Sequence, residues 1–123
     1  MGKSVHNDVL DAGLNYIAAN ADKLTICSAQ PTTYAEANAT YALGDAVPSF
    51  TGPADGDASG RKLTVDAVSG ADVDATGEAS HVALLDTAGS KLLYVTTLAE
   101  AQNVTAGNTF NLAAWDIEIA DPT

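Results

Sequence analysis

Two short apolar runs on either side of a turn constrain the fold of this chain more than any other feature of its sequence. The runs cover residues 81–85 and 91–97, and the residues between them read Asp-Thr-Ala-Gly-Ser. Both runs are rich in leucine and β-branched residues and are too short for ordinary helices, whereas Asp, Gly and Ser favour turns. The pattern predicts a β-hairpin over Ser80–Thr97.

Both faces of this hairpin carry apolar side chains. In the first arm, regular alternation places Val82 and Leu84 on one face and Ala83 and Leu85 on the other. In the second arm it separates Leu92 and Tyr94 from Leu93 and Val95 in the same way. A strand that faces water on one side alternates apolar with polar residues. We therefore expect the hairpin to be buried on both sides, by a helix or second sheet of its own chain or by another subunit.

Length and charge narrow the class of protein. The chain has 123 residues, of which 46% are hydrophobic, and it has 16 acidic against 5 basic residues, for a net charge of −11. The length predicts one domain, 1–123. The patterns described below divide it into an N-terminal helix (1–22) and a β domain (23–123). Such a charge repels nucleic acid and anionic membranes, and no apolar run approaches the roughly 20 residues of a membrane helix. We expect neither nucleic acid nor membrane as a partner.

The N-terminal region has the one strong helical pattern of the chain, over Ser4–Ala21. Its apolar residues recur at helical spacing, and Ser4 or Asn7 is the expected cap. Gly13 in its middle suggests close packing on a sheet. The strands expected after it are Lys23–Ser28, an edge strand at Ala46–Phe50, Arg61–Val68 and the hairpin. The remaining segments are expected to be a loop with one helical turn at Tyr34–Leu43, a polar turn at Thr51–Gly60, an acidic turn-rich stretch at Ser69–Glu78 and a connection at Leu98–Gly107.

The C-terminal strand region changes its apolar parity. Phe110 and Leu112 occupy even positions, whereas Trp115, Ile117 and Ile119 occupy odd ones. One regular strand cannot hold both sets on one face. The sequence therefore predicts either a β-bulge at Ala113-Ala114 or a strand that changes sheets there.

One helix followed by about six to eight short strands defines the fold class. We predict a mainly β (α+β) protein in which the N-terminal helix precedes an antiparallel β-sandwich or barrel.

No motif in the sequence identifies a catalytic reaction or a bound ligand. Residues 55–60, Asp-Gly-Asp-Ala-Ser-Gly, resemble half a calcium loop with Asp66 at its twelfth position, but a glutamate is missing there and two basic residues follow at once. A hydrogen-bonded turn explains them better. The acidic run Asp66, Asp72, Asp74 and Glu78 is predicted to be a solvated surface that a basic partner could contact.

The nucleophile and base candidates also lack partners in the sequence. His6 and His81 have no catalytic serine on a strained turn near them, and Cys27 lies in an apolar run where a buried thiol behaves as a small hydrophobe. The sequence predicts no catalytic residue, no cofactor and no metal site, and the chain is expected not to be an enzyme. A lone reduced cysteine fits synthesis in a reducing cytoplasm.

Several patches of the chain resemble a group of small virion proteins of tailed bacteriophages. The patches together cover about half of the chain and include 4–17, 27–37, 57–62, 77–84 and 114–122. The resemblance implies a virion component and brings no catalytic residues, without a particular place in the virion. A compact, acidic, β-rich chain without a site fits a capsid decoration or cement protein. Its partners would be the major capsid protein or other virion proteins, and its location would be the virion, after synthesis in the host cytoplasm.

Three functions remain open beside decoration of the capsid. They are a tail, neck or head–tail joining component, a host-surface or carbohydrate-binding module that uses Trp115 and tyrosines, and an enzyme. A homo-oligomer, with a trimer favoured, fits the first reading because symmetric oligomers bury apolar surface between copies. The residues expected at such an interface are Leu85, Leu93, Val95 and Trp115.

Overall fold

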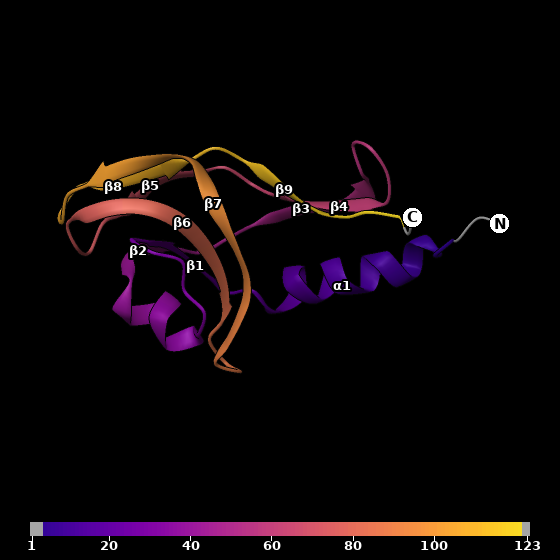
Figure 1. Cartoon of the computed structure of the whole chain (residues 1–123), viewed down its shortest axis with the longest axis horizontal. Coiled ribbons are helices and arrows are strands. Elements are labelled where there is room, and N and C mark those ends of the chain that lie inside the picture. The colour runs from indigo at the N-terminus through magenta and orange to yellow at the C-terminus, as the bar shows by residue number, and fades with distance from the viewer. Residues whose placement is uncertain (1–3, 122–123) are drawn as a thin grey trace. The chain divides into compact units, whose positions relative to one another are not determined.

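The computed structural model describes residues 4–121 and is mainly β, with antiparallel sheets and one N-terminal α-helix, as predicted (Figure 1). The chain divides into two compact units that alternate along the sequence. Unit 1 takes 1–19, 49–67 and 113–123, and unit 2 takes 20–48 and 68–112. The N-terminal helix thus shares a unit with strands from the middle and the end of the chain, which the predicted division at residue 22 did not anticipate.

Unit 1 is a helix packed on a small sheet. Helix α1 (Asn7–Asn20) accompanies three antiparallel strands in the order β3 (Phe50–Asp55), β4 (Arg61–Val65) and β9 (Trp115–Ile119). Its core contains the buried side chains of Leu10, Leu14, Leu63, Val65 and Ile117. On β4 and β9 these apolar residues alternate with Lys62, Thr64, Asp116 and Glu118. The sheet therefore has one apolar and one polar face.

Two details of α1 test predictions made from the sequence. A Cβ on Gly13 would lie 3.3 Å from Cδ1 of Ile119 on β9, which confirms the expected close packing of this glycine on a sheet. The expected cap was wrong, because neither Ser4 nor Asn7 caps the helix. Instead the carbonyl of His6 accepts the first helical N–H, from Val9, and its Nδ1 accepts the N–H of Asp8 at 3.0 Å. An imidazole nitrogen thus replaces the usual hydroxyl or carboxylate.

Unit 2 contains two antiparallel sheets. The larger has the order β2 (Ala42–Ala46), β1 (Lys23–Cys27), β6 (Gly77–Asp86) and β7 (Lys91–Val104), and the smaller pairs β5 (Val68–Asp72) with β8 (Thr109–Leu112). A single bridge between Gly44 and Val73 joins the two sheets at β2. Each sheet is open at its ends, so the predicted barrel is not closed among the described residues.

The predicted hairpin is present as β6 and β7, and it is longer than expected. Residues 82–86 of the first arm are all buried, as predicted, whereas residues 92–96 of the second arm are only half-buried, so the prediction of burial on both sides holds for β6 and was wrong for β7. One face packs on η1, a π-helical segment (Glu36–Thr40), where Cys27, Ala37, Ala83 and Leu85 form a buried cluster. The cover on this face therefore comes from the chain itself.

The predicted alternation of the second arm was wrong at one residue. Leu85 pairs with Leu92 and Leu84 pairs with Tyr94, so that Leu93 is the extra residue of a bulge. Leu92 and Val95 consequently pack on the same buried cluster, although regular alternation would have separated them. A bulge arises from strand pairing, which the sequence of one arm does not reveal.

The helical turn expected within Tyr34–Leu43 is present as η1, but other segment assignments needed correction. The expected edge strand at Ala46–Phe50 has only its end residues in strands, and 47–49 connect β2 to β3. The expected strand at Arg61–Val68 ends at Val65, the expected connection at Leu98–Gly107 is strand as far as Val104, and the expected turns at Thr51–Gly60 and Ser69–Glu78 contain β3 and β5. Strand pairing decides the two turn assignments: β3 pairs with the next strand β4, and Asn111 Oδ1 on the distant β8 accepts the N–H of Gly70 on β5 at 2.7 Å. Local turn propensity is weaker than such pairing.

The parity change near the C-terminus has the second of its two predicted explanations. β8 ends at Leu112 and belongs to the small sheet of unit 2, whereas β9 begins at Trp115 and pairs with β4 in unit 1. Ala113-Ala114 is therefore where the chain changes sheets rather than where one strand bulges. Phe110 and Trp115 accordingly belong to the cores of different units.

Candidate functional site

The four residues predicted to form an interface do not lie together in one unit. Leu85, Leu93 and Val95 belong to unit 2, and Trp115 belongs to unit 1. Leu85 has no exposed surface, since it is part of the buried cluster beneath η1, and Val95 packs against that cluster. Leu93 and Trp115 are half-buried. Of the three predicted interface residues in the hairpin, Leu93 is therefore the one that has exposed surface and does not pack against this cluster.

Trp115 has an unusual hydrogen-bonding environment. Its indole Nε1 is buried, and among the described residues it has no hydrogen-bond partner. A buried N–H without an acceptor destabilises the fold. A substitution that removes this N–H would therefore break no hydrogen bond. The sequence could not have indicated this, because it depends on how β9 packs.

The environment of Trp115 gives a testable expectation against the carbohydrate-binding reading. Because Trp115 is the single tryptophan of the chain, its fluorescence reports this site alone. We expect emission at shorter wavelength than free tryptophan, slow quenching by acrylamide, and no change on addition of mono- and disaccharides. Emission like that of free tryptophan, shifted by a sugar, would favour a stacking platform instead.

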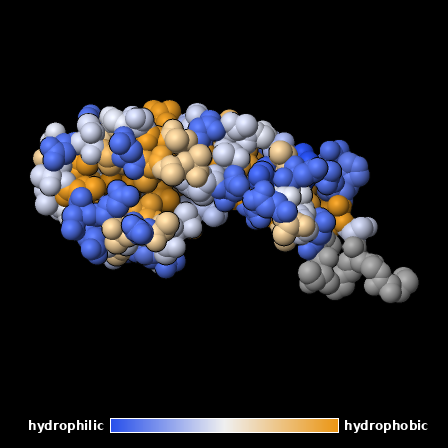
Figure 2. Space-filling model, turned by 90° about the horizontal axis from the view of Figure 1, so that it is seen from above, coloured by the Kyte–Doolittle hydropathy of each residue, from blue (hydrophilic) through white to orange (hydrophobic). Residues whose placement is uncertain are grey.

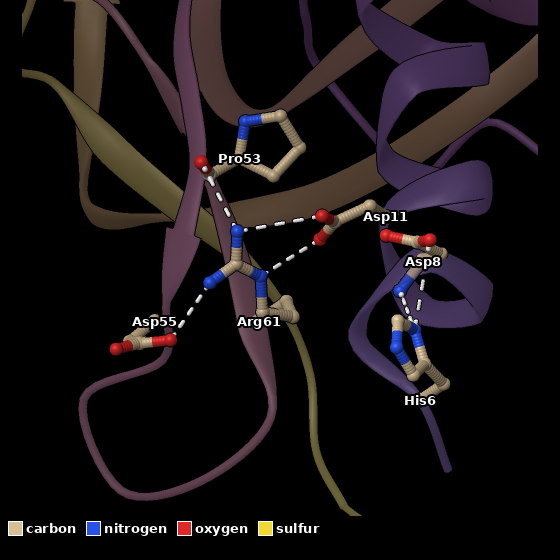
Figure 3. Close-up of polar contacts among 6 residues, drawn as sticks. All are labelled: His6, Asp8, Asp11, Pro53, Asp55 and Arg61. Atoms are coloured by element: carbon tan, nitrogen blue, oxygen red, sulfur yellow. Dashed lines mark hydrogen bonds and ion pairs between the residues drawn. The ribbon is translucent and has the colours of Figure 1, made fainter.

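Arg61 forms the most connected polar cluster of unit 1 (Figure 3). Its guanidinium donates to both carboxylate oxygens of Asp11 on α1, at 2.8 and 3.3 Å, and to Asp55 on β3 at 2.7 Å. It also donates to the carbonyl of Pro53 at 3.4 Å. The hydrogen bond to Asp11, followed by that to Asp55, raises the pKa of Arg61. The bidentate pair of Arg61 with Asp11 fixes the helix to the sheet. All three nitrogens of the guanidinium take part in hydrogen bonds of the cluster.

A second charged cluster lies on the polar face of the same sheet. Asp57, Asp116 and Glu118 place carboxylate oxygens within 4.8 Å of one another. The ammonium of Lys62 lies 2.8 Å from Asp57 and 3.6 Å from Asp116, so a cation of the chain itself already offsets part of the negative charge of the group. The hydrogen bond to Lys62 lowers the pKa of Asp57. Asp57 is distant in sequence from the other two carboxylates. The sequence indicated only that Asp116 and Glu118 share one face of their strand, through the alternation of polar and apolar residues.

The calcium-like run at 55–60 has its oxygens engaged in other contacts. Asp55 binds Arg61, Asp57 binds Lys62, and the N–H of Gly56 donates to the carbonyl of Gly60 at 2.9 Å, which closes a turn. Asp66, at the twelfth position, accepts hydroxyl hydrogen bonds from Ser49 and Thr51, both at 2.7 Å. The preferred sequence reading, a turn rather than a metal loop, agrees with the backbone hydrogen bond, but Asp55 and Asp57 bind basic side chains instead of the backbone of the turn.

The hydrogen bonds to Asp66 predict a specific dependence of stability on pH. They lower the pKa of Asp66, with Ser49 the larger cause. A carboxylate with a lowered folded-state pKa stabilises the fold above its unfolded pKa, near pH 4, and this contribution is lost as the pH falls through the folded value. We expect Asp66→Asn to be less stable than the natural chain at pH 7 and to lose this deficit as the pH falls through the lowered folded-state pKa of Asp66.

Asp72→Asn is the matched control for this experiment, because it removes the same charge from an exposed position on β5. The unfolding free energy of the three proteins, measured in urea between pH 7 and pH 2.5, checks the expectation. Parallel curves for Asp66→Asn and Asp72→Asn would show that the Ser49 and Thr51 hydrogen bonds are not the cause.

The histidines and the cysteine do not form a catalytic arrangement among the described residues. Ser80 Oγ lies 2.8 Å from Nδ1 of the adjacent His81, while Asp86 accepts the N–H of Gly89 at 3.1 Å in the hairpin turn. Cys27 is fully buried, and burial raises the pKa of its thiol. The expected structural role of Cys27 agrees with this position.

Comparisons with protein families, with curated proteins and with solved structures find no match to this chain. Among the described residues, no helix is long and apolar enough to cross a membrane.

Proposed function

We propose that this chain is a non-enzymatic structural protein of a tailed-bacteriophage virion, and that it decorates and stabilises the capsid lattice. The proposal begins from the resemblance of its sequence patches to small virion proteins. The location that follows is the virion, and the partner that follows is the major capsid protein.

The distribution of charge is the observation that carries the proposal furthest. Unit 1 has eight acidic and three basic residues, a net charge of −5, and unit 2 has eight and two, a net charge of −6. Lys23, Arg61 and Lys62 are each held by a carboxylate. Figure 2 displays a largely hydrophilic face that hydrophobic residues interrupt in places. A chain with acid on both units binds a protein shell without competing for the packaged nucleic acid.

The number of copies in purified particles tests the proposal. We expect quantitative mass spectrometry of virions from the phage that encodes the chain to find it in a fixed ratio to the major capsid protein, at hundreds of copies per particle. Tens of copies would instead indicate a neck or tail component. Absence from purified particles would contradict a virion role altogether.

A further inference from the structure

Lys23, at the start of β1, has a side-chain amide as its nearest partner. Its Nζ donates to Oδ1 of Asn38 on η1 at 2.8 Å, and Oδ2 of Asp45 on β2 lies 3.6 Å from the same nitrogen. Lys62 in unit 1, by contrast, has carboxylates at both of these distances. An amine can attack the carbon of an amide with loss of ammonia, whereas the negative charge of a carboxylate repels a nucleophile. Lys23 therefore faces a group that can acylate it, and Lys62 does not.

The packing of η1 over β1 brings the three side chains of this site together. Lys23 and Thr25 lie on one face of β1, and Asp45 shares that face because it pairs with Thr25. The fully buried Thr25 donates from Oγ1 to the carbonyl of Ala37 at 2.8 Å, and Asn38 is the next residue. A buried hydrogen bond thus fixes the backbone that carries the amide, directly beside the amine.

The element that carries Asn38 is itself uncommon. η1 is π-helical over five residues, and single π-helical turns are frequent at functional sites. The side chain of Lys23 is 29% exposed and that of Asp45 is 47% exposed. The site therefore holds its reacting groups in place, and its solvent-facing side leaves an exit for a small leaving group.

We propose that Lys23 and Asn38 form an intramolecular isopeptide bond, with Asp45 as the proton carrier. Asp45 takes a proton from the ammonium, and the lone pair of Nζ then attacks Cγ of Asn38. The bond between Cγ and Nδ2 breaks as the new bond between Cγ and Nζ forms. Of the three ammonium protons, one stays on the new amide nitrogen and two leave with Nδ2 as an ammonium ion. The reaction needs no oxidant or cofactor and occurs once per chain.

Positioning supplies the rate of this reaction. Oδ1 of Asn38 is bonded to Cγ, so the amine is already one covalent bond away from the carbon that it attacks. Groups held in such a geometry react as if at effective concentrations of up to about 10⁵–10⁸ M. Because only a neutral amine is nucleophilic, we expect the bond to form faster at pH 9 than at pH 7.

The bond would fasten η1 permanently to the sheet that it covers. Lys23 and Asn38 are 15 residues apart in the chain, and Ala37 belongs to the buried cluster beneath η1. A covalent link between them keeps this cover in place when noncovalent contacts fail, which suits a structural protein.

Intact mass spectrometry of the natural chain is the first test. After incubation of the folded chain at pH 9, its mass should be lower than the mass calculated from the sequence by one ammonia, about 17 Da. Trypsin should then fail to cleave the denatured chain after Lys23, because an acylated lysine is not its substrate. Residues 4–61 should appear as one peptide with the same deficit. An unchanged mass with normal cleavage after Lys23 would overturn the proposal.

Substitutions assign the loss of ammonia to this site. Lys23→Arg and Asn38→Ala should abolish it, and Asp45→Asn should slow it at least about tenfold. Asn15→Ala and Asp72→Asn change exposed residues elsewhere and are the matched controls, which should react at the natural rate. Circular dichroism checks that each variant is folded.

Two outcomes of the substitutions would contradict the proposal. Loss of ammonia that persists in Lys23→Arg would point to cyclisation of an asparagine, and equal rates for Asp45→Asn and Asp72→Asn would exclude Asp45 as the proton carrier. The cleavage of the natural chain after Lys23 does not depend on the folding of any variant. All measurements use the purified chain, so their outcome is independent of the proposed virion role.

Discussion

Gly60→Ala is expected to destabilise the chain far more than Gly70→Ala, although both glycines have φ +69°. A side chain at this φ costs about 1–2 kcal/mol wherever it occurs, so this strain is common to both variants. Around Gly70 nothing lies within 4 Å of an added Cβ, whereas at Gly60 it would overlap the carbonyl oxygen of Ile119 and lie 2.8 Å from Cα of Ala120. The obstacle at Gly60 is backbone, which cannot rotate away.

The structural result should be separation of β9 from β4 at its C-terminal end, where Arg61 pairs with Ile119. We expect a loss of about 1–2 kcal/mol of unfolding free energy for Gly70→Ala and more than about 3 kcal/mol for Gly60→Ala, above the usual range for one substitution. Urea denaturation of the two variants measures both. Equal losses would mean that the approach of the 56–60 turn to β9 is not as close as described.

Leu84→Ala is expected to be a strongly destabilising change in the core of unit 2. Leu84 has no exposed surface and lies on β6, which pairs with β1 on one side and β7 on the other. Truncation of a buried leucine costs about 2–5 kcal/mol, because the transfer energy of the lost atoms and the cavity both contribute. A typical domain is stable by only about 5–15 kcal/mol.

Val47→Ala is the matched control, because Val47 is 84% exposed and its truncation should change stability by no more than about 0.5 kcal/mol. Thermal unfolding followed by circular dichroism compares the two variants. A small shift for Leu84→Ala, similar to that for Val47→Ala, would refute the assignment of the Leu84 face of β6 to a packed interior.

The parts of the fold that the sequence predicted are those decided by local pattern. The helix, the hairpin and the close packing of Gly13 follow from helical spacing, from two apolar runs around a turn and from a glycine on an apolar face. The parity change after Leu112 also signalled a real event, the passage of the chain from one sheet to another.

The parts that the sequence did not predict depend on partners far along the chain. β5 contains Gly70 and polar residues, yet it forms because β8 supplies both a strand and the side chain of Asn111. The bulge at Leu93 and the cluster of Asp57, Asp116 and Glu118 likewise arise only when distant strands pair. The predicted interface set mixed core and partly exposed residues because an apolar pattern does not say which side chains the chain covers itself, as it does Leu85.

The central claim is that this chain is a structural protein that recognises an assembled capsid. Cosedimentation of the purified chain with empty shells of the major capsid protein from the same phage tests it most directly, with unassembled capsid protein as the control. We expect saturable binding to shells at a fixed ratio and much weaker binding to the unassembled protein. No binding to shells at saturating concentration of the chain would contradict the claim.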